Sequence, residues 1–331
     1  MPLLTFTIRR LVSAIVLFFV FTYVLWFLGT SSGFPMLHQL GLGTFFSPGY
    51  LNWLTHILHG DFGRASRWNY TVMQIFQMAL LPSALVIIPA FLLQQVIAIP
   101  IGAFVAGRKG GLLDRIISNG MFMFTALPPF WLALMAIVYI CVGLGLFTFD
   151  GIIDIAKSLT GFNTPAYWAY FGAHPIEAIL DLANHLTLPI LIVAFVGATA
   201  DGQYVRLSML EVLNQDYIRV AKASGLPRRR IIWKHAFRNA LLPIITNIGQ
   251  QLPLLIIASS ITEYIFGIPG FGQFFIRAIY SPPNGNTGVQ RPPDLAVITG
   301  YVFLIGVLSL LSSIITDIAY AAADPRIRAS S

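Results

Sequence analysis

Long apolar segments separated by short polar ones dominate the pattern of this chain. Six of the apolar segments approach the roughly 20 residues that a helix needs to cross the hydrocarbon core of a bilayer. The expected fold is therefore all-α and transmembrane, with residues 1–331 forming one domain. The predicted spans lie at about residues 10–29, 79–106, 116–143, 184–206, 240–262 and 295–320.

The fourth span is the least apolar of the six, because its uninterrupted apolar part ends at Asp201. A helix can continue from there through Leu213 into water, which would place Asp201 near the membrane surface. Prolines lie inside four of the six spans, where each one removes a backbone hydrogen bond and bends its helix. Bent helices suit a pathway that opens and closes, although they are also common in bundles that transport nothing.

The segment Tyr217–Pro243 contains seven lysines and arginines and no acidic residue. Burying this many charges at the bilayer centre would cost on the order of 20 kcal/mol, at roughly 2.5–3.5 kcal/mol for each Lys or Arg. The segment must therefore lie in water beside the membrane. It also separates the fourth predicted span from the fifth, so that residues 207–239 form a loop between them.

Two short helices are predicted in this loop. The first has one face marked by apolar spacing, Gly225 stands at its C-cap, and Pro227 prevents its continuation. A second helix is expected from Pro227 to about Asn239. The small residues at the tip would permit close backbone approach to a partner, whereas a basic loop lying on anionic lipid is the alternative. The expected apolar face consists of Leu210, Leu213, Tyr217, Val220 and Ser224.

The basic residues predict the orientation of the chain. If the N-terminus lies in the cytoplasm, fifteen of the twenty Lys and Arg residues fall on the cytoplasmic side. Cytoplasmic loops of membrane proteins carry such an excess, so both termini are predicted to be cytoplasmic. This distribution also explains the formal charge of +7 without a nucleic-acid partner, because the charges cluster at the ends of apolar segments.

Reactive and metal-binding residues are sparse. The single cysteine, Cys141, lies inside an apolar segment, so neither an intramolecular disulfide nor a cysteine metal cluster is possible. Two histidines and one carboxylate on an external loop (His56, His59 and Asp61) are weak candidates for a metal site, and no metal is predicted. No catalytic residues are expected either, because no paired set of reactive side chains stands out on the spans.

Polar amides occur inside the second and fifth predicted spans. Such side chains face a helix bundle or a water path rather than lipid. They either line a translocation pathway or bond helices to one another, and the second interpretation is slightly favoured. The amides are Gln94, Gln95, Asn247, Gln250 and Gln251.

The polar loop resembles the cytoplasmic EAA loop of permease subunits of ATP-binding-cassette importers. The Glu-Ala-Ala positions of the general pattern are Arg219, Val220 and Ala221 here, and Leu242-Pro243 comes five residues late. In these departures the loop resembles the peptide and nickel branch of the family. In that branch the loop motif begins with Y-x-R-x-A-x-A-x-G-L and ends with R-H-A-x-R-N-A-L-L-P. The stretches HGDFG, LPPFWLALMAI, EYIFGIPGFGQ and YAAADPRIR resemble the B-type permease of dipeptide and oligopeptide importers, so the likeness covers nearly the whole chain.

The resemblance implies a six-helix permease of the type I importer fold, multi-pass in a prokaryotic inner membrane. It implies that the chain forms half of a translocation pathway for peptides. Nickel, glutathione or another small solute is the alternative substrate. An ion-coupled secondary transporter is a less favoured alternative function. The implied partners are a second permease, two ATPases, an external solute-binding protein and membrane lipid. The chain itself would be non-catalytic and without a cofactor, because ATP and Mg bind the ATPases, and it lacks a G-x-x-x-x-G-K-[ST] loop. The coupling helix that would dock on an ATPase comprises Tyr217, Arg219, Ala221, Lys222, Ala223, Ser224, Gly225, Leu226 and Pro227.

Overall fold

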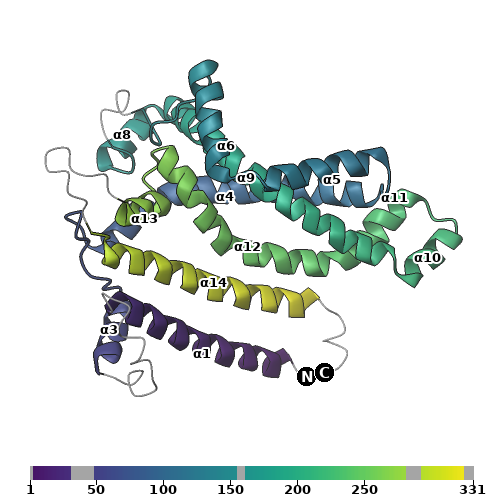
Figure 1. The fold of residues 1–331 in the computed structure, drawn as a ribbon, viewed down its shortest axis with the longest axis horizontal. Coiled ribbons are helices and arrows are strands. Elements are labelled where there is room, and N and C mark those ends of the chain that lie inside the picture. Colours follow the sequence, from purple (N-terminus) through teal and green to yellow (C-terminus); the bar gives the residue numbers. More distant parts are fainter. Residues whose placement is uncertain (1–2, 31–47, 155–160, 281–291, 324–331) are drawn as a thin grey trace.

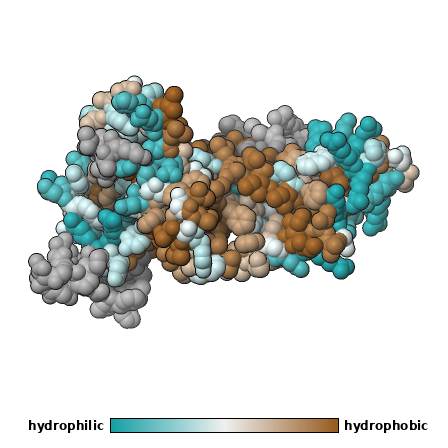
Figure 2. All heavy atoms as spheres, turned by 90° about the horizontal axis from the view of Figure 1, so that it is seen from above, coloured by the Kyte–Doolittle hydropathy of each residue, from teal (hydrophilic) through white to brown (hydrophobic). Residues whose placement is uncertain are grey.

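Long helices lying side by side make up this protein. A computed structural model describes residues 3–30, 48–154, 161–280 and 292–323, and every named element in these ranges is a helix (Figure 1). Hydrophobic residues gather over the middle of the long axis, with hydrophilic residues towards both ends (Figure 2). This distribution is the one expected of a helical bundle that crosses a membrane along its long axis.

The helices α4 (Val72–Ala106) and α9 (Pro175–Leu213) pack together at the centre of the bundle. They approach so closely at Gly102 that an added Cβ there would lie 2.6 Å from the carbonyl oxygen of Gly202. Both helices are longer than the predicted spans 79–106 and 184–206. The early start of α4 follows from a capping box at Thr71, whose hydroxyl accepts from the backbone N–H of Gln74 at 3.2 Å.

The third predicted span, 116–143, is divided and sharply bent. It contains α5 (Leu112–Thr125), α6 (Pro129–Ala136) and the π-helix η2 (Ile137–Gly143), with an angle of 92° between α5 and the α6–η2 pair. Pro128 is extended, as expected of a residue that precedes another proline. The bend falls at the prolines where the sequence predicted one, and it divides the span into separate helices.

The remaining long helices agree with the predicted spans more closely. They are α1 (Leu3–Thr30), α12 (Phe237–Ile265) and α14 (Leu295–Ala323), although α12 bends by 46° between Gln251 and Pro253. Within the described residues, three helices are long and apolar enough to cross a membrane alone, and up to five if each bent pair counts as one span. The figure of six spans remains a prediction.

Short helices lie near one end of the bundle. They are α3 (Pro48–Leu58), α8 (Pro165–Ala173) and α13 (Phe271–Ile279). The start of α1 and the end of α14 lie at the opposite end, on the same side as the polar loop (Figure 1). The stretch 281–293 is rich in Pro, Gly and Asn, which predicts a loop without regular structure, and it falls mostly outside the described residues.

Candidate functional site

The polar loop contains a short helix held between two long ones. After α9 ends at Leu213, the chain forms α10 (Asp216–Ala223) and turns at Gly225. It continues through α11 (Arg228–Arg230) and the π-helix η3 (Ile231–Ala236) directly into α12. The second predicted helix of the loop is thus the beginning of α12 rather than a separate element.

The helix α10 has a buried face and an exposed face. Ile218 is 0% exposed and packs with Ala221 against a core formed by α4, α9 and η3. Tyr217 and Val220 point outward, with 43% and 65% of their surface exposed. The predicted apolar face, which ran from Leu210 to Ser224, was wrong because Asn214 and Gln215 interrupt the helix and reset its phase.

The turn after α10 has the form that the sequence indicated. Gly225 has a φ of +72°, a left-handed conformation that glycine adopts without steric cost. Its N–H donates to the carbonyl of Lys222 at 3.1 Å, and a Cβ added to Gly225 would meet no atom within 4 Å. The tip of the loop is therefore open to a partner. Of the remaining predicted coupling residues, Arg219, Ala223, Ser224 and Pro227 are exposed, whereas Leu226 is half-buried.

Side-chain bonds hold the loop against the long helices. The guanidinium of Arg228 donates to the carbonyl of Gly107 just after α4, and the amide of Asn239 in α12 donates to the hydroxyl of Tyr217 at 2.7 Å. Arg219 forms an exposed ion pair with Asp216 at 3.2 Å, which contributes little to stability. Side-chain bonds thus connect α10 to α12, and the segment that follows α10 to the end of α4.

An ion pair between α9 and α5 lies near the same end. Arg206 contacts both carboxylate oxygens of Asp114, at 2.8 and 3.1 Å, and Asp114 is 4% exposed. The backbone N–H of Gly110 and the hydroxyl of Ser118 also donate to this carboxylate. Arg206 is one of the fifteen basic residues predicted on the cytoplasmic side, but nothing in the local pattern reveals a partner 92 residues away.

Four of the five predicted amides converge on one carboxylate deeper in the bundle. Gln94 and Gln95 each donate to Oδ2 of Asp201 at 2.7 Å. Asn247 and Gln251 donate to its Oδ1 at 3.1 and 2.9 Å.

Asp201 was expected near the membrane surface, but it is 2% exposed and enclosed by α4 and α12. Gln94 lies twelve residues before the end of α4, which corresponds to about 18 Å of helix. The cluster joins α4, α9 and α12, which is what hydrogen bonding between helices requires of these amides. Gln250, the fifth amide, is exposed and lies apart from the cluster.

A small cavity of about 150 Å³ adjoins this cluster. Its walls include Gln94, Gln251 and Thr262, together with apolar side chains. The carbonyl oxygen of Gln94 and the hydroxyl of Thr262 are buried without a hydrogen-bond partner in the described part of the chain. The cavity therefore combines apolar walls with free polar atoms at the centre of the bundle.

The external histidines do not converge on one point. His56 lies 3.0 Å from Asp61, whereas the ring of His59 contacts the carbonyl of Thr55 at 2.7 Å. The backbone N–H of Gly63 and then the His56 ring hold the pKa of Asp61 below its ordinary value. No group of three potential metal ligands occurs in the ranges that the structure describes.

Comparisons with known proteins agree with this architecture. Residues 98–329 match the family described as binding-protein-dependent transport system inner membrane component. The chain is 37% identical over 283 residues to the oligopeptide transport system permease protein AppB of Bacillus subtilis, covering 84% of this chain and 79% of that relative. It is 31% identical over 301 residues to the dipeptide transport system permease protein DppB of Escherichia coli, covering 88% and 84%.

A solved structure shares the fold. The inward-facing MetNI methionine ABC transporter matches with a TM-score of 0.55 and 17% identity, over 76% of this chain and 97% of that one. The family match covers more than two thirds of the chain, and the two relatives extend over most of its length. This protein therefore belongs to the family of inner membrane components of binding-protein-dependent transport systems.

Proposed function

We propose that this chain forms half of the translocation pathway of an ATP-driven importer of peptides. Its similarity to oligopeptide and dipeptide permeases supports the substrate class. A second permease would complete the pathway, two ATPases would bind the polar loop, and a solute-binding protein would deliver the peptide on the opposite side. The chain contributes no catalytic group to this cycle, because ATP and Mg bind the ATPases.

The main structural support for ATPase docking is the exposed face of α10. Tyr217 and Val220 present apolar surface at the tip of a loop that is otherwise rich in charge. Exposed apolar side chains rimmed by polar ones are typical of protein interfaces. Because Ile218 anchors α10 from behind, a force applied to Tyr217 and Val220 would move the core beneath it. Closure of the ATPases would thereby rock α12 and α9 as rigid bodies.

The orientation follows from the same assignment. ATPases of importers work in the cytoplasm, so the end of the bundle that carries α10 would be cytoplasmic. The start of α1 and the end of α14 lie at this end, which supports cytoplasmic termini (Figure 1). The helices α3, α8 and α13 would then face the solute-binding protein.

Reconstitution of the whole transporter tests the substrate and the energy source. Proteoliposomes that contain both permeases and both ATPases, with binding protein and labelled dipeptides or oligopeptides, should accumulate peptide only with ATP and Mg. Nickel and glutathione serve as competing substrates. Accumulation driven by an ion gradient through this chain alone would refute the proposal, and uptake of nickel or glutathione in place of peptide would refute the substrate class.

A pair of variants at Val220 tests the docking face. Val220→Asp places a charge on the exposed apolar surface and should abolish peptide uptake, with the protein still inserted and folded. Val220→Ile keeps the surface apolar and should retain uptake. Pull-down of the ATPases by each variant measures docking directly, and full docking and uptake by Val220→Asp would contradict the role of α10. Ala221→Glu is a poorer test because Ala221 packs against the core.

A further inference from the structure

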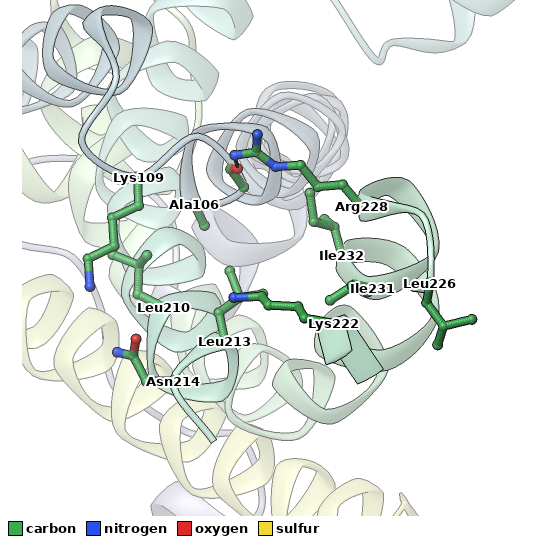
Figure 3. A pocket seen from close by; sticks show the side chains of 11 residues that line it. Ala106, Lys109, Leu210, Leu213, Asn214, Lys222, Leu226, Arg228, Ile231 and Ile232 are labelled. Atoms are coloured by element: carbon green, nitrogen blue, oxygen red, sulfur yellow. Dashed lines mark hydrogen bonds between the residues drawn. The ribbon is translucent and has the colours of Figure 1, made fainter. Parts of the chain in front are cut away.

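A pocket of about 450 Å³ lies between α10 and the ends of α4 and α9 (Figure 3). Its walls come from the end of α4, the end of α9, and the segment from α10 to η3. Lys222 was predicted to belong to the docking surface. Its side chain extends across this pocket towards Leu213, as Figure 3 shows. Lys222 therefore lines the pocket in addition to its predicted place in the docking surface.

Three basic residues line the pocket and no acidic residue does. They are Lys109, Lys222 and Arg228, which come from three different parts of the chain. None of the three forms an ion pair with another residue in the described ranges. Arg228 is held in place through its bond to the carbonyl of Gly107, which positions its charge at the pocket wall. Uncompensated cations from separate elements favour an anion between them.

The other walls of the pocket are apolar. Leu210 and Leu213 of α9 face Ile231 and Ile232 of η3. The pocket also borders Ala106, the last residue of the apolar helix α4, and Arg228 of the basic loop, so it lies between an apolar and a charged part of the chain. A ligand that fits must combine a negative group with an apolar part and must be present at this boundary.

We propose that this pocket binds the headgroup region of an anionic phospholipid from the leaflet on the α10 side. The phosphate would lie among Lys109, Lys222 and Arg228, and the start of an acyl chain would lie along the leucine and isoleucine wall. Such a lipid connects the loop after α4 to α10, so its presence restrains the position of α10. Binding itself does not depend on the transported substrate or on the direction of transport.

Titration of the purified full-length chain with lipid tests this assignment. Native mass spectrometry or fluorescence should show tighter binding of phosphatidylglycerol than of phosphatidylcholine. Each basic residue near an anionic headgroup is worth about a fivefold change in affinity. Lys109→Gln and Lys222→Gln should therefore each weaken phosphatidylglycerol binding about fivefold, and the double variant about 25-fold.

Lys234→Gln is the matched control, because Lys234 is an exposed lysine of the same loop that does not line the pocket. It should leave phosphatidylglycerol binding unchanged. An equal loss in Lys234→Gln would indicate general surface attraction and overturn the proposal. Displacement of the lipid by millimolar inorganic phosphate would assign the site to a free anion instead. The same titration is repeated on the complex with both ATPases. If Lys222→Gln no longer weakens phosphatidylglycerol binding there, an acidic residue of the ATPase occupies the pocket, and the lipid site is refuted.

Discussion

Replacement of Asp201 by asparagine is the sharpest test of the amide cluster. Asparagine has the same shape, but it keeps only one carbonyl oxygen and places an NH₂ group where the second carboxylate oxygen was. If the carbonyl still accepts from Asn247 and Gln251, the NH₂ group then faces the amide nitrogens of Gln94 and Gln95. Two of the four hydrogen bonds are lost unless those amides rotate.

The expected loss follows from the number of bonds. Interhelical hydrogen bonds within membranes contribute about 0.6 kcal/mol on average and about 1.7 kcal/mol at most. Asp201→Asn should thus lower the free energy of unfolding by about 1–3 kcal/mol, and Asp201→Leu, which removes all four bonds, by about 2–7 kcal/mol. Gln250→Leu is the control, since this amide is exposed, and its effect should stay below about 0.5 kcal/mol.

Unfolding of the purified chain in a defined detergent, followed by circular dichroism, measures these changes. A double-mutant cycle between Asp201→Asn and Gln251→Leu then isolates the interaction between the two side chains. The coupling energy should exceed about 0.5 kcal/mol, because the residues share a hydrogen bond. If Asp201→Asn is as stable as the unaltered chain and the two changes are additive, the carboxylate does not hold the three helices together.

Three further substitutions test other parts of the structure. Arg206→Met leaves Asp114 as a buried carboxylate without its ion pair, and it should lower the free energy of unfolding by about 3 kcal/mol in the same assay. The double variant Arg206→Met, Asp114→Leu should recover much of this loss, because it removes the buried charge as well. Gly225→Pro is incompatible with a φ of +72° and should abolish peptide uptake without loss of insertion, while Gly225→Asn, which tolerates this conformation, should retain uptake. Gly272→Ala should displace α13 because its Cβ would meet the backbone of α12, whereas Gly120→Ala, whose Cβ would meet nothing, should be neutral by thermal unfolding.

Local signals in the sequence were sufficient for the turn of the polar loop. Gly225 and Pro227 each impose a backbone conformation regardless of their surroundings, so the end of α10 could be predicted. The start of α10 could not, because Asn214 and Gln215 are compatible with a continuing helix. Only packing of Ile218 against the core below selects the interruption. A shift of two residues then reverses which face of α10 is exposed.

The amide cluster illustrates the same limit over a longer range. Amides within apolar helices predict that some polar partner exists in the bundle, and the sequence supplied both the amides and Asp201. Their convergence depends on how α4, α9 and α12 pack, since Gln94 and Asp201 are 107 residues apart. Because the apolar part of the fourth predicted span ends at Asp201, this residue was expected near water. In the structure, amide side chains inside the bundle donate the hydrogen bonds that its carboxylate accepts.

The bend of α12 connects the polar loop to the amide cluster. From Arg228 to Gln251 the chain runs in one direction, and it turns by 46° before Pro253, whose ring removes a backbone hydrogen bond. Midway along this part, Asn239 bonds to Tyr217 of α10, and near its end Asn247 and Gln251 bond to Asp201. If α10 acts as proposed, its displacement would reach the cluster along α12, and the bend lies just beyond the point where α12 is attached to α9. Both bonds from α12 to Asp201 therefore come from the part of the helix before the bend.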